Sequence, residues 1–255
     1  MVTAGTLEAA DRDSGSVEPE GVVVKFRSGF NGSEVRRPWL GVSAQDLQAA
    51  APWRTFRWYK GQKHYSGTYW SATCGGHVIY ESRLELARLL LADFDPLVSW
   101  IVPQPVLLEA TVDGARRRHI PDFLLLTSNA PVVVDVKPAR QAANPLVAST
   151  FGWTRAVVES RGWRYEVWHA ADPVHLANVR FLAGYRHPQH VDTQIVDALS
   201  DKEIAGMTVG EAIDSERRWP SAIVRAALMH MLWRQQFTVD LTRPLSRGHV
   251  LVAAA

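Results

Sequence analysis

The chain has 255 residues, 47% of them hydrophobic, and a formal net charge of +2. This composition excludes a chain that is disordered throughout, and no apolar run approaches the length of a membrane span, so we expect no membrane partner. The single Cys74 excludes an internal disulfide and a cysteine-rich zinc site. The first residues lack the pattern of a signal peptide, so we expect a cytoplasmic protein.

Residues 1–21 differ in composition from the rest of the chain. They are rich in Gly, Ala and Ser and carry five acidic residues against Arg12 alone, a balance of −4. We therefore predict a disordered acidic tail over residues 1–21. Because the whole chain is +2, residues 22–255 carry +6, which suits a polyanionic partner.

Residues 52–73 interleave aromatic rings with Lys, Arg and His side chains. Such a run can grip a nucleic-acid backbone, and Lys60 and Lys63 are then candidate DNA contacts. The alternative is a Trp-rich strand pair that packs on the core and leaves its cations exposed, because Trp and Tyr are common in strands. The two interpretations are compatible, and both stay open.

The next elements are predicted from apolar periodicity and turn residues. Residues 80–94 repeat apolar side chains at helical spacing and end before Pro96, which predicts a helix. Asp113-Gly114 predicts a tight turn between two strands. The other expected elements are strands at 22–30, 104–111, 116–127, 132–137 and 163–169, and helices at 43–50 and 145–160. This order predicts an α/β domain with a mixed sheet over residues 22–171.

Residues 172–255 are predicted to form a helical C-terminal domain that resembles a winged-helix module. Thr208 and Glu211 have capping-box spacing, which predicts the start of a short helix. A second, amphipathic helix is expected at 220–235, followed by a hairpin that turns at 244–248. The region has no cluster of acids with a Lys, so we expect it to contact DNA or protein and not to carry chemistry.

A candidate site lies on two adjacent strands of the first domain. Asp122 follows Pro121 in HIPDFLLL, and Asp135 and Lys137 lie in VVVDVKP. Because side chains two apart on a strand share a face, Asp135 and Lys137 project together. Two carboxylates beside a Lys can hold a divalent cation and a phosphate, and the oxygen ligands favour Mg²⁺ or Mn²⁺. A structural pair between one Asp and Lys137 is the alternative, since a buried Asp needs a partner.

A third acid is expected from the helix at 80–94. Glu85 can face the sheet, and Glu81 lies one turn earlier on the same side, so both remain candidates. His77 is a weaker candidate near the site. His119, three residues before Asp122, is expected on the opposite face, and Gln104 either lines the site or caps a strand.

Four segments make a longer and more specific pattern, namely HVIYESRLELARLLLADFDPLV, QPVLL, PDFLLL and VVVDVKPA. The Asp, Asp and Lys pattern with a helix acid resembles the PD-(D/E)xK nuclease superfamily. Together the four segments resemble the N-terminal catalytic domain of TnsA, the endonuclease subunit of heteromeric bacterial transposases. The resemblance covers residues 54–169 and extends only loosely beyond them. Its motifs favour Glu85 over Glu81 as the helix acid.

The resemblance implies a restriction-endonuclease-like mixed sheet flanked by helices. It implies a Mg²⁺-dependent DNA endonuclease, with Mn²⁺ as a substitute, that hydrolyses phosphodiester bonds at transposon ends during cut-and-paste transposition. Glu85, Asp122 and Asp135 would hold the metal, and with Lys137 they would be the catalytic residues. A partner transposase subunit and an ATPase regulator are the implied protein partners.

Two other functions stay open. One is a stand-alone restriction or repair nuclease with the same site, and the other is a non-catalytic DNA-binding assembly subunit, which the complete set of three acids and a Lys disfavours. Arg116, Arg117 and Arg118 lie on a strand that leads into the site. They are candidate DNA contacts, and the alternative is a solvated sheet edge that discourages strand pairing.

Overall fold

The computed structural model describes residues 17–54 and 65–254. Within these ranges the chain is a mixed α/β protein, as the sequence predicts, and it divides into two compact units. The first comprises the chain up to Ala92 together with Leu97–Ala170, and the second comprises Asp93–Pro96 together with Ala171–Ala255. This division lies one residue from the predicted boundary between 171 and 172.

The first unit has an antiparallel sheet built around β1. Its order is β2-β1-β7-β8, and β3 also pairs with β1. The strands are β1 (Val23–Ser28), β2 (Glu34–Pro38), β3 (Ala50–Ala51), β7 (Leu107–Val112) and β8 (Ala115–His119). Asp113 and Gly114 have positive φ values of 50° and 74° and form the tight β7–β8 turn that they predict.

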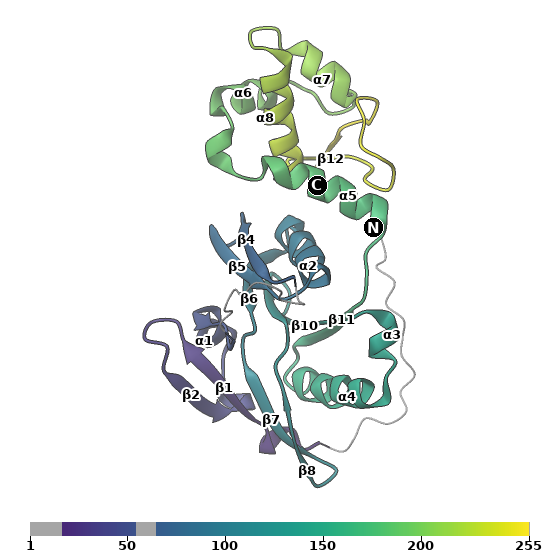
Figure 1. Cartoon of the computed structure of the whole chain (residues 1–255). Coiled ribbons are helices and arrows are strands. Elements are labelled where there is room, and N and C mark those ends of the chain that lie inside the picture. The colour runs from purple at the N-terminus through teal and green to yellow at the C-terminus, as the bar shows by residue number, and fades with distance from the viewer. Residues whose placement is uncertain (1–16, 55–64, 255) are drawn as a thin grey trace. The chain divides into compact units, whose positions relative to one another are not determined.

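A second sheet in the same unit carries Asp135, and Asp122 and Lys137 lie at the ends of its strands. Its order is β11-β10-β9-β6, with β10 parallel to β11 and the other pairs antiparallel. The strands are β6 (Val98–Pro103), β9 (Phe123–Thr127), β10 (Val132–Val136) and β11 (Arg164–Trp168). A short turn joins β9 to β10, as predicted. The parallel crossover from β10 to β11 runs through α3 (Ala139–Ala142) and α4 (Pro145–Glu159), which lies alongside these strands (Figure 1).

Two long stretches of chain pass from one sheet to the other. The predicted single strand over 116–127 is wrong, because it divides into β8 and β9 at residues 120–122. Similarly, β6, which the sequence did not predict, leads into β7 through residues 104–106. Gln104 has a φ of 45° at the break between β6 and β7, and Pro121 lies at the break between β8 and β9. The candidate site therefore lies where the chain changes sheets.

Two helices and a hairpin complete the first unit. α1 (Ala44–Gln48) begins after Ser43, which forms a capping box with Asp46. The helix predicted from residue 80 is α2 (Arg83–Phe94), and it starts later because β5 (Gly76–Tyr80) pairs with β4 (Gly67–Ser71). Short 3₁₀ turns are η1 (Pro19–Gly21), η2 (Trp39–Gly41), η3 (Ala183–Tyr185) and η4 (Pro188–His190), the last two in the second unit.

The first unit has a continuous apolar core between α4 and the sheets. Trp153 and Val157 of α4 are fully buried together with Leu124 of β9 and Val133 of β10. Trp39 joins them, and its Nε1–H donates to the Val157 carbonyl at 2.8 Å. Burial of each large apolar side chain contributes about 1.5–3 kcal/mol. This packing fixes α4 beside β10, the strand that carries Asp135.

The N-terminal segment is described only in part. Residues 1–16 of the predicted tail lie outside the described ranges. Val17 forms an antiparallel bridge with Val112, and η1 follows at Pro19–Gly21. The part of the predicted tail that is described, from residue 17, is therefore attached to the first sheet and not disordered.

The second unit is helical, as predicted. It contains α5 (Pro173–Leu182), α6 (Thr193–Ser200), α7 (Val209–Ser215) and α8 (Ser221–Trp233), with β12 (Phe237–Thr238) paired to β13 (Val252–Ala253). Thr208 and Glu211 form the predicted capping box. The predicted hairpin is reduced to two-residue strands, and Asn178 Nδ2 donates to the carbonyls of Leu241 and Arg243 in the loop between them. No helix in the described ranges is long and apolar enough to cross a bilayer.

Candidate active site

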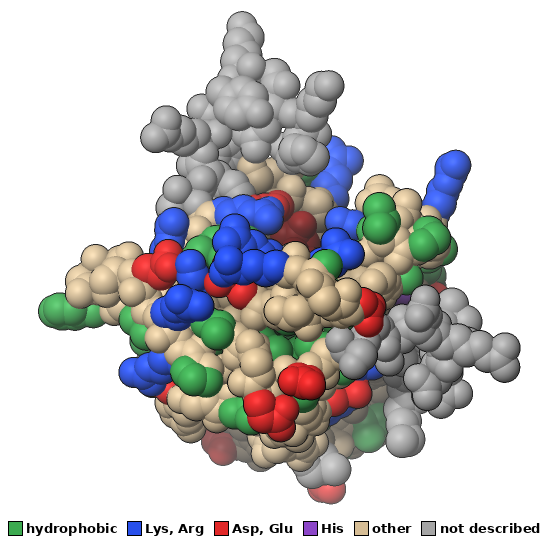
Figure 2. Space-filling view, turned by 90° about the horizontal axis from the view of Figure 1, so that it is seen from below, with side chains coloured by type: hydrophobic (Ala, Val, Ile, Leu, Met, Phe, Trp, Pro, Cys, Tyr) green, Lys and Arg blue, Asp and Glu red, His purple; other side chains and the backbone are tan. Residues whose placement is uncertain are grey.

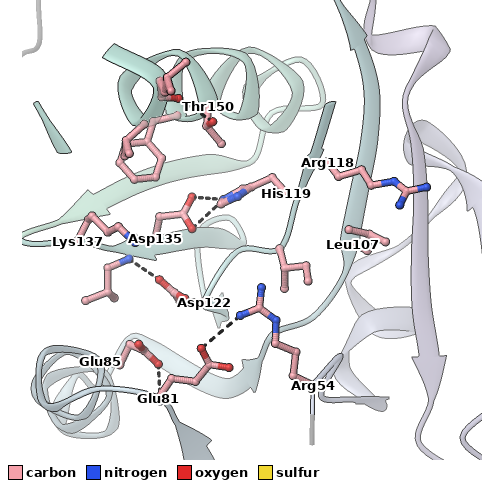
Figure 3. A pocket seen from close by; sticks show the side chains of 15 residues that line it. Arg54, Glu81, Glu85, Leu107, Arg118, His119, Asp122, Asp135, Lys137 and Thr150 are labelled. Carbon is pink, nitrogen blue, oxygen red and sulfur yellow. Dashed lines mark hydrogen bonds and ion pairs between the residues drawn. The ribbon is translucent and has the colours of Figure 1, made fainter. Parts of the chain in front are cut away.

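A cavity of about 600 Å³ opens between the start of α2, the break between β8 and β9, the end of β10, and α4 (Figure 3). One wall is acidic, the rim carries cations, and the wall on α4 is largely apolar. Its lining side chains include Glu81, Glu85, Asp122, Asp135, Lys137, Arg54, Arg118, His119, Leu146 and Phe151. The structure thus brings all four predicted catalytic residues to one cavity.

Asp122 lies at the break between β8 and β9, so the alternation of side chains along either strand does not set its direction. Its Oδ2 accepts the backbone N–H of Val136 at 2.7 Å. Burial, followed by the negative charges of Asp135 and Glu85, raises the pKa of Asp122 from 3.8 to about 8. Lys137 opposes this shift without offsetting it. The negative charges of two other carboxylates thus act on Asp122, and a cation would relieve this repulsion.

Asp135 is almost fully buried in β10, where two side chains bind its carboxylate. His119 Nε2 lies 2.9 Å from Oδ1 and 2.8 Å from Oδ2, and the Tyr165 hydroxyl donates to Oδ2. The prediction that His119 points away from the site is wrong. It assumed one alternating strand through residue 122, whereas β8 ends at His119.

Glu85 is buried, with 9% of its surface exposed, and it organises the first turn of α2. Its carboxylate accepts the Ser82 hydroxyl at 2.9 Å and the Glu81 backbone N–H at 2.7 Å, while Ser82 Oγ accepts the Glu85 N–H at 3.1 Å. Burial is the main cause of a raised Glu85 pKa. The Ser-x-x-Glu spacing is the sequence signal for this arrangement. Glu81 therefore precedes the helix, and its predicted place one helical turn before Glu85 is wrong.

Glu81 is held by residues that come from other elements. Gln104 Nε2 donates to its Oε1 at 2.6 Å, and an Arg54 guanidinium nitrogen lies 3.3 Å from its Oε2. Gln104 Oε1 in turn accepts the Arg54 backbone N–H at 2.8 Å. Gln104 is buried, and it supports Glu81 from behind the cavity lining.

We expect Glu85→Gln to reduce DNA cleavage more than Glu81→Gln, by roughly tenfold or more between the two variants. The charge of Glu85 acts directly on Asp122, whereas the causes of the Asp122 pKa shift do not include Glu81. Cleavage rates of the two purified variants at saturating Mg²⁺ make the comparison. The reverse order would assign the helix acid to Glu81.

Lys137 follows β10, and its side chain lines the cavity beside Asp135, as strand alternation predicts. Its backbone is fixed on both sides, because its N–H donates to the Trp168 carbonyl at 2.9 Å and its carbonyl lies 2.8 Å from His169 Nδ1. The ammonium is close enough to lower the pKa values of Glu85 and Asp122. His77 lies elsewhere, at a separate cavity of about 250 Å³.

The candidate DNA contacts differ in their surroundings. Arg118 lines the cavity, and both Arg118 and Arg116 pair with the buried Glu109, at 2.8 and 3.2 Å. Arg117, between them on β8, has the opposite side-chain direction. Figure 2 shows Lys and Arg side chains gathered on one face, with acidic side chains deeper between them. Lys60 and Lys63 lie outside the described residues.

The carboxylates at the cavity are candidate ligands for Mg²⁺. Within the described ranges, no group of three or more His, Cys, Asp or Glu side chains is placed so that it could hold a metal ion. Mg²⁺, however, usually takes one or two carboxylates and completes its shell with waters and substrate phosphate. In chemical type, the carboxylates of Asp122 and Asp135 match that donor set, and Glu85 lines the same cavity.

The raised pKa of Asp122 predicts a pH dependence of stability in metal-free protein. Its pKa is about 8 in the folded state against an ordinary value of 3.8, so between these values the folded state binds a proton that the unfolded state does not. By linkage, the free energy of unfolding falls as pH rises from about 4 to about 8, and the effect levels off above that range. Asp122→Asn should flatten this dependence. Urea unfolding in EDTA across this range measures it, and parallel curves for both proteins would contradict the assignment.

Sequence reasoning missed two residues at the site, His119 and Tyr165. Tyr165 lies on β11 in the same region as Asp135, since β10 and β11 are parallel and Asp135 pairs with Val167. Only this register connects the two residues, and the strand WRYEVWH gives no local signal of it. Arg54 is one cation of the aromatic run at residues 52–73, and its place beside Glu81 depends on Gln104, whose Oε1 accepts the Arg54 backbone N–H.

Comparison with known proteins assigns no family to the chain. No protein-family model matches it, and no curated protein matches it either. The interpretation of the site therefore depends on its residues and their geometry.

Proposed function

We propose that the chain is a Mg²⁺-dependent DNA endonuclease of the PD-(D/E)xK type, and that it acts as the TnsA-like subunit of a transposase at transposon ends. The observation that carries the proposal is the convergence of Glu85, Asp122 and Asp135 with Lys137 at one open cavity. Mutual repulsion within this set, seen in the raised pKa of Asp122, is the expected condition of a cation site.

The side chains suit phosphodiester hydrolysis. Glu85, Asp122 and Asp135 would hold Mg²⁺ or Mn²⁺, which when bound activates water and stabilises the charge of the transition state. The Lys137 ammonium can hydrogen-bond to a phosphate oxygen or to the attacking water. Its backbone directly follows β10 and its N–H donates to the Trp168 carbonyl, which keeps the ammonium beside the carboxylates.

The fold supports the finer assignment. A mixed sheet carries Asp135 on a central strand, a helix supplies Glu85 at its first turn, and α4 covers the sheet beside them. We assign this core to the restriction-endonuclease-like class that the sequence resemblance implies. We also assign the C-terminal unit to a winged-helix-like module that contacts DNA or protein.

The charges outside the acidic wall support a DNA substrate. Arg54 and Arg118 stand at the cavity, and the chain from residue 22 carries +6. Cations around an acidic centre allow a DNA backbone to approach while the carboxylates stay with the metal. A partner transposase, which would cut and join the other strand, and an ATPase regulator complete the proposed assembly.

Cleavage of DNA that carries transposon ends tests this function. The purified full chain would be incubated with Mg²⁺ and end-labelled DNA, with and without the proposed partner transposase. We expect cleavage at the transposon end that the transposase makes specific. Equal cleavage of unrelated DNA, unaffected by the transposase, would favour the stand-alone nuclease. DNA binding without cleavage under any of these conditions would favour the non-catalytic subunit.

A further inference from the structure

The carboxylate of Asp135 is bound from two directions by side chains that the catalytic set does not include. His119 Nε2 contacts both oxygens, at 2.9 and 2.8 Å, and the Tyr165 hydroxyl contacts Oδ2 (Figure 3 shows the His119 contacts). A carboxylate only accepts hydrogen bonds, so both neighbours donate to it. Asp135 is 3% exposed, so these contacts replace most of its solvation.

The two donors leave the oxygens of Asp135 unequal. Each carboxylate oxygen has two lone pairs. Oδ2 accepts from both Tyr165 and His119, whereas Oδ1 accepts, among the described residues, from His119 alone. Oδ1 therefore keeps a lone pair for another ligand. This is the oxygen that the arrangement makes available.

Both donors are held in place by packing. The His119 ring contacts the rings of Phe151 and Trp153 edge-on, with centroids 6.4 and 6.2 Å apart. Tyr165 is buried in β11, and the Arg155 guanidinium lies over its ring, 5.1 Å from the centroid. Neither side chain can turn away without disturbing the core.

We propose that His119 and Tyr165 are positioning residues that orient the Asp135 carboxylate for a divalent cation. The inference rests on the proposed function, and it adds residues that no motif supplied. Partners of this kind, bonded to a metal ligand but not to the metal, typically change metal affinity by about 10–100-fold when removed. The effect on the cation therefore separates a positioning role from a purely structural one.

A competing arrangement predicts the opposite sign. In this arrangement His119 Nε2, which contacts both oxygens of Asp135, competes with a cation for the carboxylate. In that case removal of the imidazole would strengthen cation binding. The geometry favours positioning, because Tyr165 and His119 share Oδ2 and leave a lone pair on Oδ1.

Titration of the full chain with Mn²⁺, followed by calorimetry in the absence of DNA, tests the proposal. The variants are His119→Ala, His119→Gln, which restores an N–H donor, and Tyr165→Phe, which removes only the hydroxyl. His77→Ala is the matched control, since His77 is exposed and lies at a different cavity. Thermal unfolding of each variant without metal establishes that it is folded.

We expect His119→Ala and Tyr165→Phe to raise the Kd for Mn²⁺ by about 10–100-fold, His119→Gln to recover much of the loss, and His77→Ala to have no effect. The Mg²⁺ concentration for half-maximal nicking should rise in parallel, with kcat largely recovered at saturating Mg²⁺. An unchanged Kd in folded His119→Ala and Tyr165→Phe overturns the proposal, and a lower Kd in His119→Ala assigns His119 as a competitor.

These outcomes are distinct from a failure of the proposed function. If the wild-type protein binds Mn²⁺ and cleaves DNA and the variants behave like it, only the positioning role of His119 and Tyr165 is disproved. Wild-type protein that neither binds Mn²⁺ nor cleaves DNA removes the proposed function and this inference together. If His119→Ala does not fold, Tyr165→Phe and His119→Gln still decide the question.

Discussion

Asp122→Ala should reduce DNA cleavage by about 10³-fold or more, since losing one group that stabilises the transition state already costs roughly 10²–10³-fold. The negative charges of Asp135 and Glu85 both act on Asp122, and its Oδ2 accepts the Val136 N–H. Asp122 is therefore the central residue of the acidic wall. Under the proposed function, its removal takes away a metal ligand that the other two carboxylates cannot replace. Single-turnover cleavage at saturating Mg²⁺ measures the loss.

Two control variants separate chemistry from stability. Asp122→Asn keeps the side-chain size and relieves the repulsion, so it should fold at least as stably as wild type in EDTA and still be inactive. Glu159→Ala removes an exposed acid on α4 that pairs with Arg155, and it should cleave normally. Cleavage at the wild-type rate by Asp122→Ala would show that Asp122 is not a catalytic residue.

Lys137→Met should lower the cleavage rate by about 10²–10³-fold while Mn²⁺ binding is retained. Methionine approximates the length of Lys without its charge, so the variant removes only the ammonium beside the carboxylates. Losing this charge should also raise the pKa values of Asp122 and Glu85 further, because Lys137 lowers both. Rate measurements and Mn²⁺ calorimetry on the same preparation separate the two effects.

Lys137→Arg provides the matched comparison. It keeps the charge but replaces a compact ammonium with a planar guanidinium, so we expect only partial recovery of cleavage. Full activity in Lys137→Met would show that the Lys serves as an ion-pair partner of the acids. That result would revive the structural pairing that the sequence left open.

The sequence predicted the parts of the fold that depend on local patterns. The Asp113-Gly114 turn, the Thr208 capping box and the short β9–β10 connection all follow from residue types at fixed spacing. Asp135 and Lys137 reach the same cavity because strand alternation is a local rule. These features need no knowledge of distant residues.

The sequence did not predict features that depend on long-range pairing. The break between β8 and β9 has no strong signal besides Pro121, yet it turns His119 toward Asp135. Tyr165 reaches the same carboxylate only through the β10–β11 register. Gln104 likewise binds Glu81 from a backbone conformation with a φ of 45°. A glutamine in the sequence does not indicate such a conformation.

Nicking of supercoiled plasmid DNA by the purified full chain tests the central claim most directly, namely that these carboxylates hold a cation for phosphodiester hydrolysis. Wild type and Asp122→Ala would be compared in Mg²⁺, in Mn²⁺ and in EDTA, with the partner transposase added to one series. We predict open-circular product from wild type in either metal, none in EDTA, and none from Asp122→Ala. Equal nicking by wild type with and without EDTA, or by Asp122→Ala, would contradict the claim.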